Sequence, residues 1–230
     1  MATAQVQQPA KIVRALSGTH ELVVETALRY TARGSRALDL GAGSGFLTER
    51  LQNAGLRVVA ADMVNYLAVN AEFVQADFND PAFDRALPSP FDLITSVEVI
   101  EHLENPTAFL RSIGRLLQSD GVAILTTPNV ENAAARAKFF LCGEVRAMDR
   151  NSPEHMTPIY LDLFTRKLVP PSGLTLVDHF VFPLGDFPLT GRRYFIPLFR
   201  LLKGIMKGRA LTGDTHFLVL KKVSRQSQLV

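Results

Sequence analysis

The stretch at residues 37–46 constrains the fold more than any other part of the chain, because it places a glycine-rich turn directly after a short apolar strand. It reads Ala-Leu-Asp-Leu-Gly-Ala-Gly-Ser-Gly-Phe. Glycine permits a sharp turn and lets a ligand lie directly on the backbone, because no Cβ stands in the way. Phe46, Leu47 and Leu51 then share one face of a predicted helix, whose N-terminal N–H groups point at the bound group. The pattern predicts a nucleotide-like ligand.

The residues around the turn argue against a dinucleotide site of the Gly-x-Gly-x-x-Gly type. That pattern needs its third glycine at the position of Phe46, whereas this chain has Gly45 one step earlier. Asp39 lies immediately before the turn, where a carboxylate would repel a pyrophosphate but suit a cationic ligand. S-Adenosylmethionine carries a sulfonium and an ammonium group and fits this charge. The segment Asp-Leu-Gly-Ala-Gly-Ser-Gly resembles the first motif of class I S-adenosylmethionine-dependent methyltransferases.

Further apolar segments end in acidic residues at the spacing that this resemblance implies. Residues 57–61 lead into Asp62, roughly 20 residues past the turn, where an acid can accept hydrogen bonds from both ribose hydroxyls. Residues 72–76 lead into Asp77, which by resemblance reads the adenine through its exocyclic amine. The resemblance implies that the cofactor S-adenosyl-L-methionine is held by Asp39, Gly41, Ala42, Gly43, Gly45, Asp62, Met63, Asp77, Phe78, Val97 and Glu98.

Strand and helix patterns alternate along the chain, which predicts an α/β fold. With the resemblance, we expect a Rossmann-like class I methyltransferase fold: a seven-stranded, mostly parallel sheet with an antiparallel last strand and helices on both faces. Only a turn or two of helix fits between Asp62 and Asp77. After the first strand, further strands are expected at 57–61, 72–76, 91–97, 122–126, 175–182 and 215–222, and helices at 12–30, 45–54, 107–117 and 158–168.

The 230 residues and their 47% hydrophobic content fit a single methyltransferase domain at 1–222, followed by a C-terminal tail at 223–230. We expect an N-terminal helix at about 10–31 and an insertion at about 183–213. A single cysteine, Cys142, cannot form an intrachain disulfide and suggests a reducing compartment.

The chain shows neither a secretory signal pattern nor an apolar run of about 18 residues. We therefore expect a cytoplasmic protein that is at most peripheral to a membrane. A formal net charge of +3 does not indicate a nucleic-acid partner.

The insertion contains a basic amphipathic pattern at residues 192–209. Such a helix favours an anionic membrane surface or an acidic partner, and the alternative is a helix that packs its apolar side on its own domain. The basic residues are Arg192, Arg193, Arg200, Lys203, Lys207 and Arg209, and the apolar arc is Leu198, Phe199, Leu201, Leu202, Ile205 and Met206.

His102 is the candidate catalytic base, because its ordinary pKa lies near neutrality and it follows the fourth strand near the expected methyl group. The alternative is an orienting or helix-start histidine. Glu98 is expected to form a wall of the methionine pocket. His20, His179 and His216 are expected to be structural or solvated.

Glu98, Glu101 and His102 are spaced i, i+3 and i+4, so on a helix they would share one face. With His155 they could bind a divalent metal. The same arrangement is similar to that of ubiquinone-biosynthesis O-methyltransferases and small-RNA 2′-O-methyltransferases, in which such residues bind a metal that helps to activate a hydroxyl. Class I members without a metal also contain Glu-x-x-Glu-His-Leu, so a site without metal remains open.

The resemblance implies O-methylation of a small-molecule or lipid- or glycan-linked acceptor, capped by residues 139–160. One alternative is a small-RNA 2′-O-methyltransferase with a Glu/Glu/His metal site. The other is a binding protein that keeps the cofactor fold without turnover.

Overall fold

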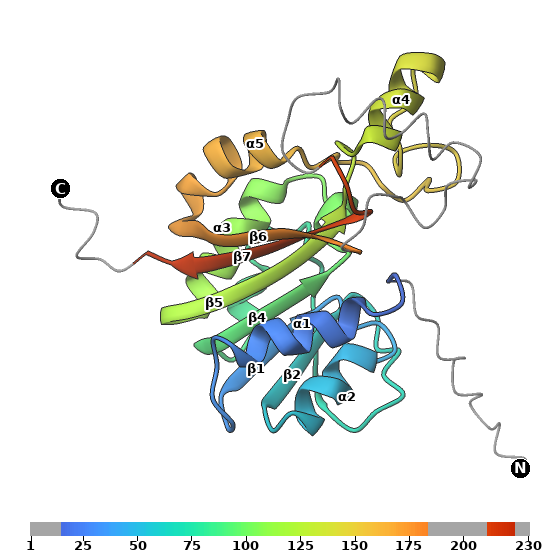
Figure 1. Ribbon diagram of the computed structural model, residues 1–230. Helices are drawn as coiled ribbons and strands as arrows, with labels where there is room; N and C mark the ends of the chain where they lie inside the picture. Colours follow the sequence, from blue (N-terminus) through green and yellow to red (C-terminus); the bar gives the residue numbers. More distant parts are fainter. Residues whose placement is uncertain (1–14, 184–210, 224–230) are drawn as a thin grey trace, which may run out of the picture.

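The computed structural model describes residues 15–183 and 211–223, which form a seven-stranded sheet in the order β3-β2-β1-β4-β5-β7-β6 (Figure 1). Strand β7 is antiparallel to both of its neighbours, and the other pairs are parallel. This confirms the predicted fold class. The strands are β1 Arg36–Leu40, β2 Arg57–Asp62, β3 Glu72–Gln75, β4 Phe91–Val97, β5 Leu117–Pro128, β6 Leu174–Phe182 and β7 Thr215–Lys222.

Helices cover both faces of the sheet and enclose two hydrophobic cores. Neighbouring residues on β1 show the division, because Ala37 packs in the core beneath α1 and α2 while Leu38 packs in the core beneath α3 and α5. Strands buried on both faces need apolar residues at consecutive positions, as β1 and β4 have. The helices are α1 Thr19–Leu28, α2 Phe46–Asn53, α3 Pro106–Leu116, α4 Ala133–Cys142 and α5 Leu161–Leu163, with short turns η1 Phe83–Ala86, η2 Ile100–His102, η3 Phe164–Leu168 and η4 Pro170–Ser172.

The first helix is shorter than its apolar pattern predicts. Helix α1 begins at Thr19, because Gly18 before it adopts a left-handed conformation with φ of 90°. The predicted helix at 158–168 is an α-helix only over Leu161–Leu163 and continues as a short π-helix at Phe164–Leu168. Between Asp62 and Asp77, where the sequence leaves room for at most a turn or two of helix, residues 63–71 contain none.

Helix α4 was not predicted, although its termini carry recognisable signals. The Asn132 side chain caps its first turn, and Gly143 ends it with φ of 68°. The helix projects from the body of the domain (Figure 1). The basic pattern at 192–209 lies outside the described residues.

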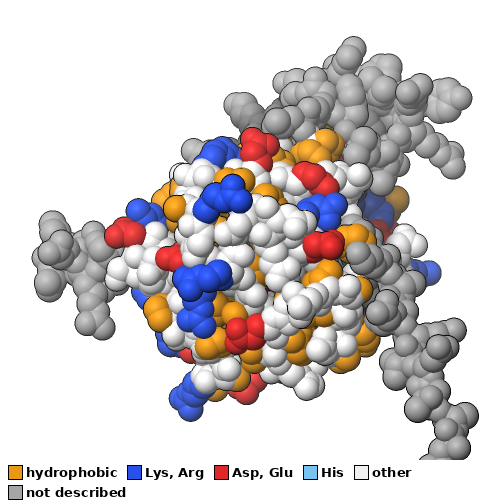
Figure 2. All heavy atoms as spheres, turned by 90° about the horizontal axis from the view of Figure 1, so that it is seen from below, with side chains coloured by type: hydrophobic (Ala, Val, Ile, Leu, Met, Phe, Trp, Pro, Cys, Tyr) orange, Lys and Arg blue, Asp and Glu red, His pale blue; other side chains and the backbone are white. Residues whose placement is uncertain are grey.

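Lys and Arg side chains are interspersed with Asp and Glu on the face shown in Figure 2, without a separate patch of either sign. In the described ranges, none of the helices is long and apolar enough to cross a bilayer.

Candidate functional site

A cleft of about 940 Å³ opens at the carboxyl ends of the parallel strands, where the loops after β1, β2, β3 and β4 meet. The loop at residues 143–157, which follows α4, closes one side of it. Ten of the eleven predicted cofactor residues line this cleft, and their contact with the cofactor stays a prediction: Asp39, Gly41, Ala42, Gly43, Asp62, Met63, Asp77, Phe78, Val97 and Glu98.

Gly45 is the exception, because it faces away from the cleft lining. A Cβ at this position would lie 2.5 Å from Val69 Cγ2 and 3.1 Å from Leu67 Cδ2. Gly45 is the N-cap of α2 with φ of 85°. Its role is therefore to turn the chain into α2 beside Val69.

The other two glycines of the turn have different reasons to be glycine. At Gly41, with φ of 78°, a Cβ would lie 2.3 Å from Val99 Cγ2, so the close approach of backbone to Val99 excludes a side chain. At Gly43, with φ of 52°, a Cβ would have no neighbour within 4 Å. Gly43 thus leaves open space above the turn, on the cleft.

Asp39 is buried beneath the turn and holds it in place. Its Oδ2 accepts a hydrogen bond of 2.7 Å from the Thr48 hydroxyl of α2, and its Oδ1 accepts one of 2.9 Å from the Thr95 hydroxyl of β4. Burial raises the pKa of Asp39 to about 6, and the hydrogen bonds from the two hydroxyls oppose that rise. Asp39 therefore joins β1 to α2 and β4 while it lies at the floor of the cleft.

Asp62 at the end of β2 is oriented by backbone N–H groups. Its Oδ2 accepts from Gly43 N at 2.8 Å, and its Oδ1 accepts from Met63 N at 2.7 Å. A carboxylate oxygen can accept two hydrogen bonds. Each oxygen of Asp62 therefore keeps the capacity to accept one more from a ligand in the cleft.

The third strand delivers Asp77 and Phe78 to the same cleft. Asp77 Oδ1 accepts from Asn79 N at 2.9 Å, which fixes the carboxylate in a local turn. The ring of Phe78 packs against Phe83 and Phe109, with centroids 5.2 and 5.8 Å away. This packing gives the cleft a rigid apolar wall next to a carboxylate.

Glu98 turns the chain sharply after β4, with φ of 53° in the left-handed region. Such a conformation costs about 1–3 kcal/mol for a residue other than glycine. Its backbone N donates to Thr126 O at 3.2 Å, and its Oε1 accepts from the Thr126 hydroxyl at 2.9 Å. Burial raises the pKa of Glu98 to about 7, and the Thr126 hydroxyl opposes the rise.

The prediction that Glu98, Glu101 and His102 share a helical face is wrong. The segment is a short 3₁₀ turn, Ile100–His102, and Glu98 precedes it in a left-handed conformation. Among the described residues, the group of possible metal ligands is instead Glu101, His102 and His155, with one ligand atom of each lying within 4.8 Å of the others. The rings of the two histidines meet edge to face, with centroids 4.5 Å apart.

Backbone hydrogen bonds bring His155 to this turn from more than fifty residues away. The N–H groups of Met156 and Thr157 donate to the Glu101 carbonyl at 2.9 and 3.0 Å. The Thr157 hydroxyl also donates to Leu103 O at 2.6 Å. These bonds fix the loop after α4 against the turn that carries His102.

Backbone carbonyls determine which nitrogen of each neutral histidine carries the proton. Nδ1 of His102 lies 3.2 Å from Glu154 O, and Nδ1 of His155 lies 2.6 Å from Ala147 O. A carbonyl oxygen can only accept, so each Nδ1 donates and each Nε2 keeps its lone pair. Both rings can therefore accept a proton or bind a cation through Nε2.

The carboxylate of Glu101 is fully buried, and neither oxygen has a hydrogen-bond partner of good geometry within the described residues. Burial, and then the nearby Glu98, raise the pKa of Glu101 well above its usual value, while a backbone N–H and the Thr127 side chain oppose the rise. A buried carboxylate without partners needs either a proton or a cation.

Several residues of the cleft were not predicted as site residues. His20 of α1, which we expected to be structural or solvated, lines the cleft, as does Tyr66. Ser152 and Glu154 also line it, and they belong to the segment 139–160 that was expected to cap the acceptor. Burial is the main cause that lowers the pKa of His20. No sequence pattern marks His20 or Tyr66, because their positions depend on how α1 and the loop after β2 pack.

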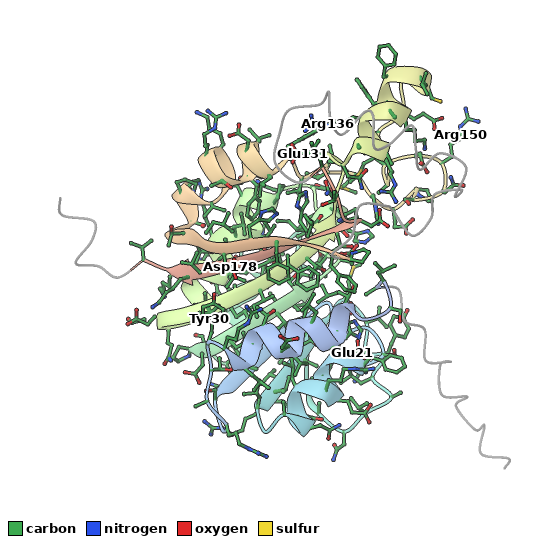
Figure 3. The ribbon with its side chains drawn as sticks, viewed as in Figure 1. Glu21, Tyr30, Glu131, Arg136, Arg150 and Asp178 are labelled. Atoms are coloured by element: carbon green, nitrogen blue, oxygen red, sulfur yellow. The ribbon has the colours of Figure 1, made fainter. Side chains whose placement is uncertain are left out.

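His179 and His216 lie away from the cleft, on adjacent strands of the sheet edge. Nε2 of His179 is 3.0 Å from Nδ1 of His216, and Nε2 of His216 is 4.0 Å from Glu131 Oε2. Oε2 of Glu131, which is labelled in Figure 3, also accepts from Leu161 N at 2.6 Å. This bond connects the segment before α4 to the start of α5. Both histidines therefore lie in the packing between β6 and β7, and the expectation that they are structural or solvated stays a prediction.

A family profile described as a methyltransferase domain matches residues 14–160. The ubiquinone biosynthesis O-methyltransferase of Xanthomonas euvesicatoria pv. vesicatoria is 33% identical over 135 residues, which cover 55% of this chain and 56% of that protein. The chain thus spans about half the length of the curated relatives that it matches.

Solved structures show the same fold at low sequence identity. A SAM-dependent methyltransferase from Archaeoglobus fulgidus is 18% identical, with a TM-score of 0.62, over 89% of this chain and 95% of that one. A 1,6-didemethyltoxoflavin-N1-methyltransferase from Burkholderia thailandensis, solved with S-adenosylhomocysteine, is 16% identical with a TM-score of 0.56, over 89% and 77%.

Proposed function

The chain belongs to the methyltransferase domain family, and we propose on this basis that it transfers the methyl group of S-adenosylmethionine to a hydroxyl oxygen. The observation that carries the cofactor assignment is the contact between Gly43 and Asp62, which sets a carboxylate beside an uncovered glycine backbone. The named activity of the O-methyltransferase relatives supports an oxygen as the acceptor atom.

The chemistry of the cleft suits this cofactor. Asp62 would accept hydrogen bonds from the ribose hydroxyls through its free lone pairs, and Asp77 would accept from the adenine amine beside the wall formed by Phe78. The open space at Gly43 leaves room for the ligand on the backbone. When bound, S-adenosylmethionine supplies a methyl group that its sulfonium has already activated, so the protein must chiefly position the acceptor.

His102 is the residue that would take the proton from the acceptor hydroxyl. Its Nδ1 donates to Glu154 O, so Nε2 is the nitrogen that would act as the base. The ring lines the cleft beside Val99 and Glu98. His155 contacts the edge of His102 and keeps the ring in place.

A divalent cation at Glu101, His102 and His155 is a second proposal, made because the buried Glu101 carboxylate lacks partners next to two Nε2 lone pairs. Two imidazoles and a carboxylate form a ligand set that suits several divalent ions. A cation there would neutralise Glu101 and lower the pKa of a nearby hydroxyl. Glu98 lies close enough to raise the pKa of Glu101 and would add negative charge.

Binding and transfer can be tested separately. Calorimetry with S-adenosylhomocysteine measures whether the cleft holds the cofactor product, whatever the acceptor is. Incubation with methyl-labelled S-adenosylmethionine and cell fractions then shows whether the label enters small molecules, lipids or RNA. Binding without label transfer to any fraction would favour a non-catalytic protein, and absence of binding would contradict the proposed function.

A further inference from the structure

A second cavity, of about 310 Å³, lies beside the main cleft and shares Ser152 with it. We propose that it is a subsite for a hydroxyl-rich group of the methyl acceptor, such as a glycosyl or polyol group. This inference rests on the proposed function, because it assumes that the reacting hydroxyl lies in the adjoining cleft. The volume is at the lower end of the range of about 300–1,000 Å³ for small-ligand sites.

Polar side chains from two parts of the chain line this cavity. Asn129 follows β5 and Asp214 precedes β7, whereas Arg146, Asp149 and Asn151 belong to the loop after α4. The remaining lining residues are Ser152, Pro128 and Ala147. The polar part of the lining therefore offers both donors and acceptors.

The charged residues of the lining are already neutralised by ion pairs. Arg146 Nη1 lies 2.6 Å from Asp214 Oδ1, and Lys138 of α4 pairs with Asp149. Asp214 and Asp149 are thus each paired with a basic side chain. A site with paired charges favours a neutral polar ligand over a free anion or cation, because an ion would gain no unpaired countercharge there.

Two polar side chains of the lining remain available to a ligand. Within the described residues, the side chains of Asn151 and Ser152 have no hydrogen-bond partner, although their backbone N–H groups donate to Asp149 Oδ1 and Asp149 O at 2.9 Å each. Asp149 thereby fixes the backbone of the turn and leaves the amide and the hydroxyl free. Both groups donate and accept, which matches the dual character of ligand hydroxyls.

The same loop connects this cavity to the reacting end of the cleft. Ala147 lines the cavity and adopts φ of 64°, and its carbonyl accepts from His155 Nδ1 at 2.6 Å. His155 lines the main cleft next to His102. A hydroxyl-rich group in the cavity would therefore hold the acceptor at a fixed distance from His102.

The test is saturation-transfer NMR with methyl β-D-glucopyranoside, myo-inositol and cyclohexanol, each at millimolar concentration. The variant Asn151→Leu/Ser152→Ala removes the two unpaired side chains without breaking an internal hydrogen bond. Arg150→Ala is the matched control, because Arg150 lies in the same loop but points away from the body of the domain (Figure 3). Octyl β-D-glucopyranoside below its micellar concentration separates a free sugar from a lipid-linked one.

We expect the wild-type protein and Arg150→Ala to bind the glucoside or inositol but not cyclohexanol. The double variant should bind at least about tenfold more weakly, the loss that two hydrogen bonds to neutral groups produce. Tighter binding of the octyl glucoside than of the methyl glucoside would support a lipid-linked source, and equal binding a free glycoside.

S-Adenosylhomocysteine titrated into the same samples separates the two proposals. If it binds and no hydroxyl-rich probe does, the cavity holds water only and the subsite is refuted while the proposed function stands. Equal sugar binding by the wild type and the double variant would also overturn the subsite. Failure of both ligands would contradict the proposed function itself.

Discussion

The backbone N–H of Gly43 donates a 2.8 Å hydrogen bond to Oδ2 of Asp62, which links the glycine turn after β1 to the end of β2. The bond orients a carboxylate across the turn on which a ligand would lie. Met63 N donates to the other carboxylate oxygen, Oδ1, at 2.7 Å. The ends of β1 and β2 are thereby held together on the side of the cleft where a ligand would bind.

Asp62→Ala should weaken the binding of S-adenosylmethionine by about 1.5–3 kcal/mol, because hydrogen bonds to a charged acceptor are lost. Calorimetry measures the change. Asp80→Ala is the matched control, since Asp80 Oδ1 also accepts from a backbone N–H, that of Ala82 at 2.8 Å, but Asp80 does not line the cleft. Equal affinities of the folded Asp62→Ala variant and the wild type would remove Asp62 from the cofactor site.

His102→Ala should lower turnover by about 10²- to 10⁴-fold if His102 acts as a general base. Cofactor affinity should change little, because the proton lies on the acceptor. Methyl transfer measured with labelled cofactor, together with calorimetry, gives both quantities. Turnover within a few fold of the wild type would leave His102 with an orienting role only.

Chelation tests the cation at Glu101, His102 and His155. If the cation is used, prolonged chelation should abolish turnover, and a divalent metal should restore it. Elemental analysis should find metal in the wild type and less in His155→Ala. Full turnover of protein shown to be metal-free would refute the proposal and leave Glu101 protonated as the explanation of its unpaired carboxyl group.

Gly41→Ala should destabilise the protein more than Gly34→Ala does. Both glycines have positive φ, 78° and 83°, and therefore share a strain of about 1–3 kcal/mol when a side chain is added. At Gly34 a Cβ meets no atom within 4 Å, whereas at Gly41 it would lie 2.3 Å from Val99 Cγ2. Urea unfolding measures both free energies, and equal losses would show that Val99 moves aside without cost.

Stability should fall on acidification because of His216. Burial, and then the nearby His179, lowers the pKa of His216 to about 3, whereas an unfolded histidine has a pKa of about 6.5. Below pH 6.5 only the unfolded chain binds the proton, so the free energy of unfolding decreases by about 1.4 kcal/mol per pH unit down to about pH 3. The contribution is fully present above pH 6.5.

Comparison with His216→Asn isolates this effect. Burial raises the pKa values of Asp39 and Glu98, so their contribution to the free energy of unfolding increases on acidification. This increase is the same in both proteins. Between pH 7.5 and 5.0 the wild type should lose about 2 kcal/mol more of its unfolding free energy than His216→Asn does. Parallel pH profiles in urea unfolding would show that His216 takes up its proton in the folded state.

Local patterns were sufficient to predict the strands and the glycine turn. Strand β4 at Phe91–Val97 and strand β7 at Thr215–Lys222 agree with the predicted bounds, because apolar runs and the residues that end them act over a few positions. The carboxylates after β1, β2 and β3 could be assigned to one sheet edge since parallel strands end on the same side. These features can therefore be predicted from the spacing of residues along the chain.

Boundaries and short helices were less predictable. Helix α1 begins only after the left-handed Gly18, although the apolar pattern starts earlier in the chain. Helix α5 changes to a π-helix at Phe164. Helix α4 carries a cap at Asn132, but its alanine-rich sequence has no apolar periodicity. At helix boundaries and in short helices, the helix propensity of the residues and the spacing of apolar residues can disagree, and tertiary packing then decides the structure.

The sequence by itself determined the α/β fold and the acidic strand ends, because both follow from residues close together in the chain. The tertiary structure alone decided that Glu98 leaves the predicted helical face and how His155, which the sequence already offered as a possible ligand, reaches Glu101 and His102. The second decision depends on hydrogen bonds from Met156 and Thr157 to the Glu101 carbonyl. Contacts between segments so far apart form only once the loop after α4 packs on the sheet edge, and no local pattern encodes them.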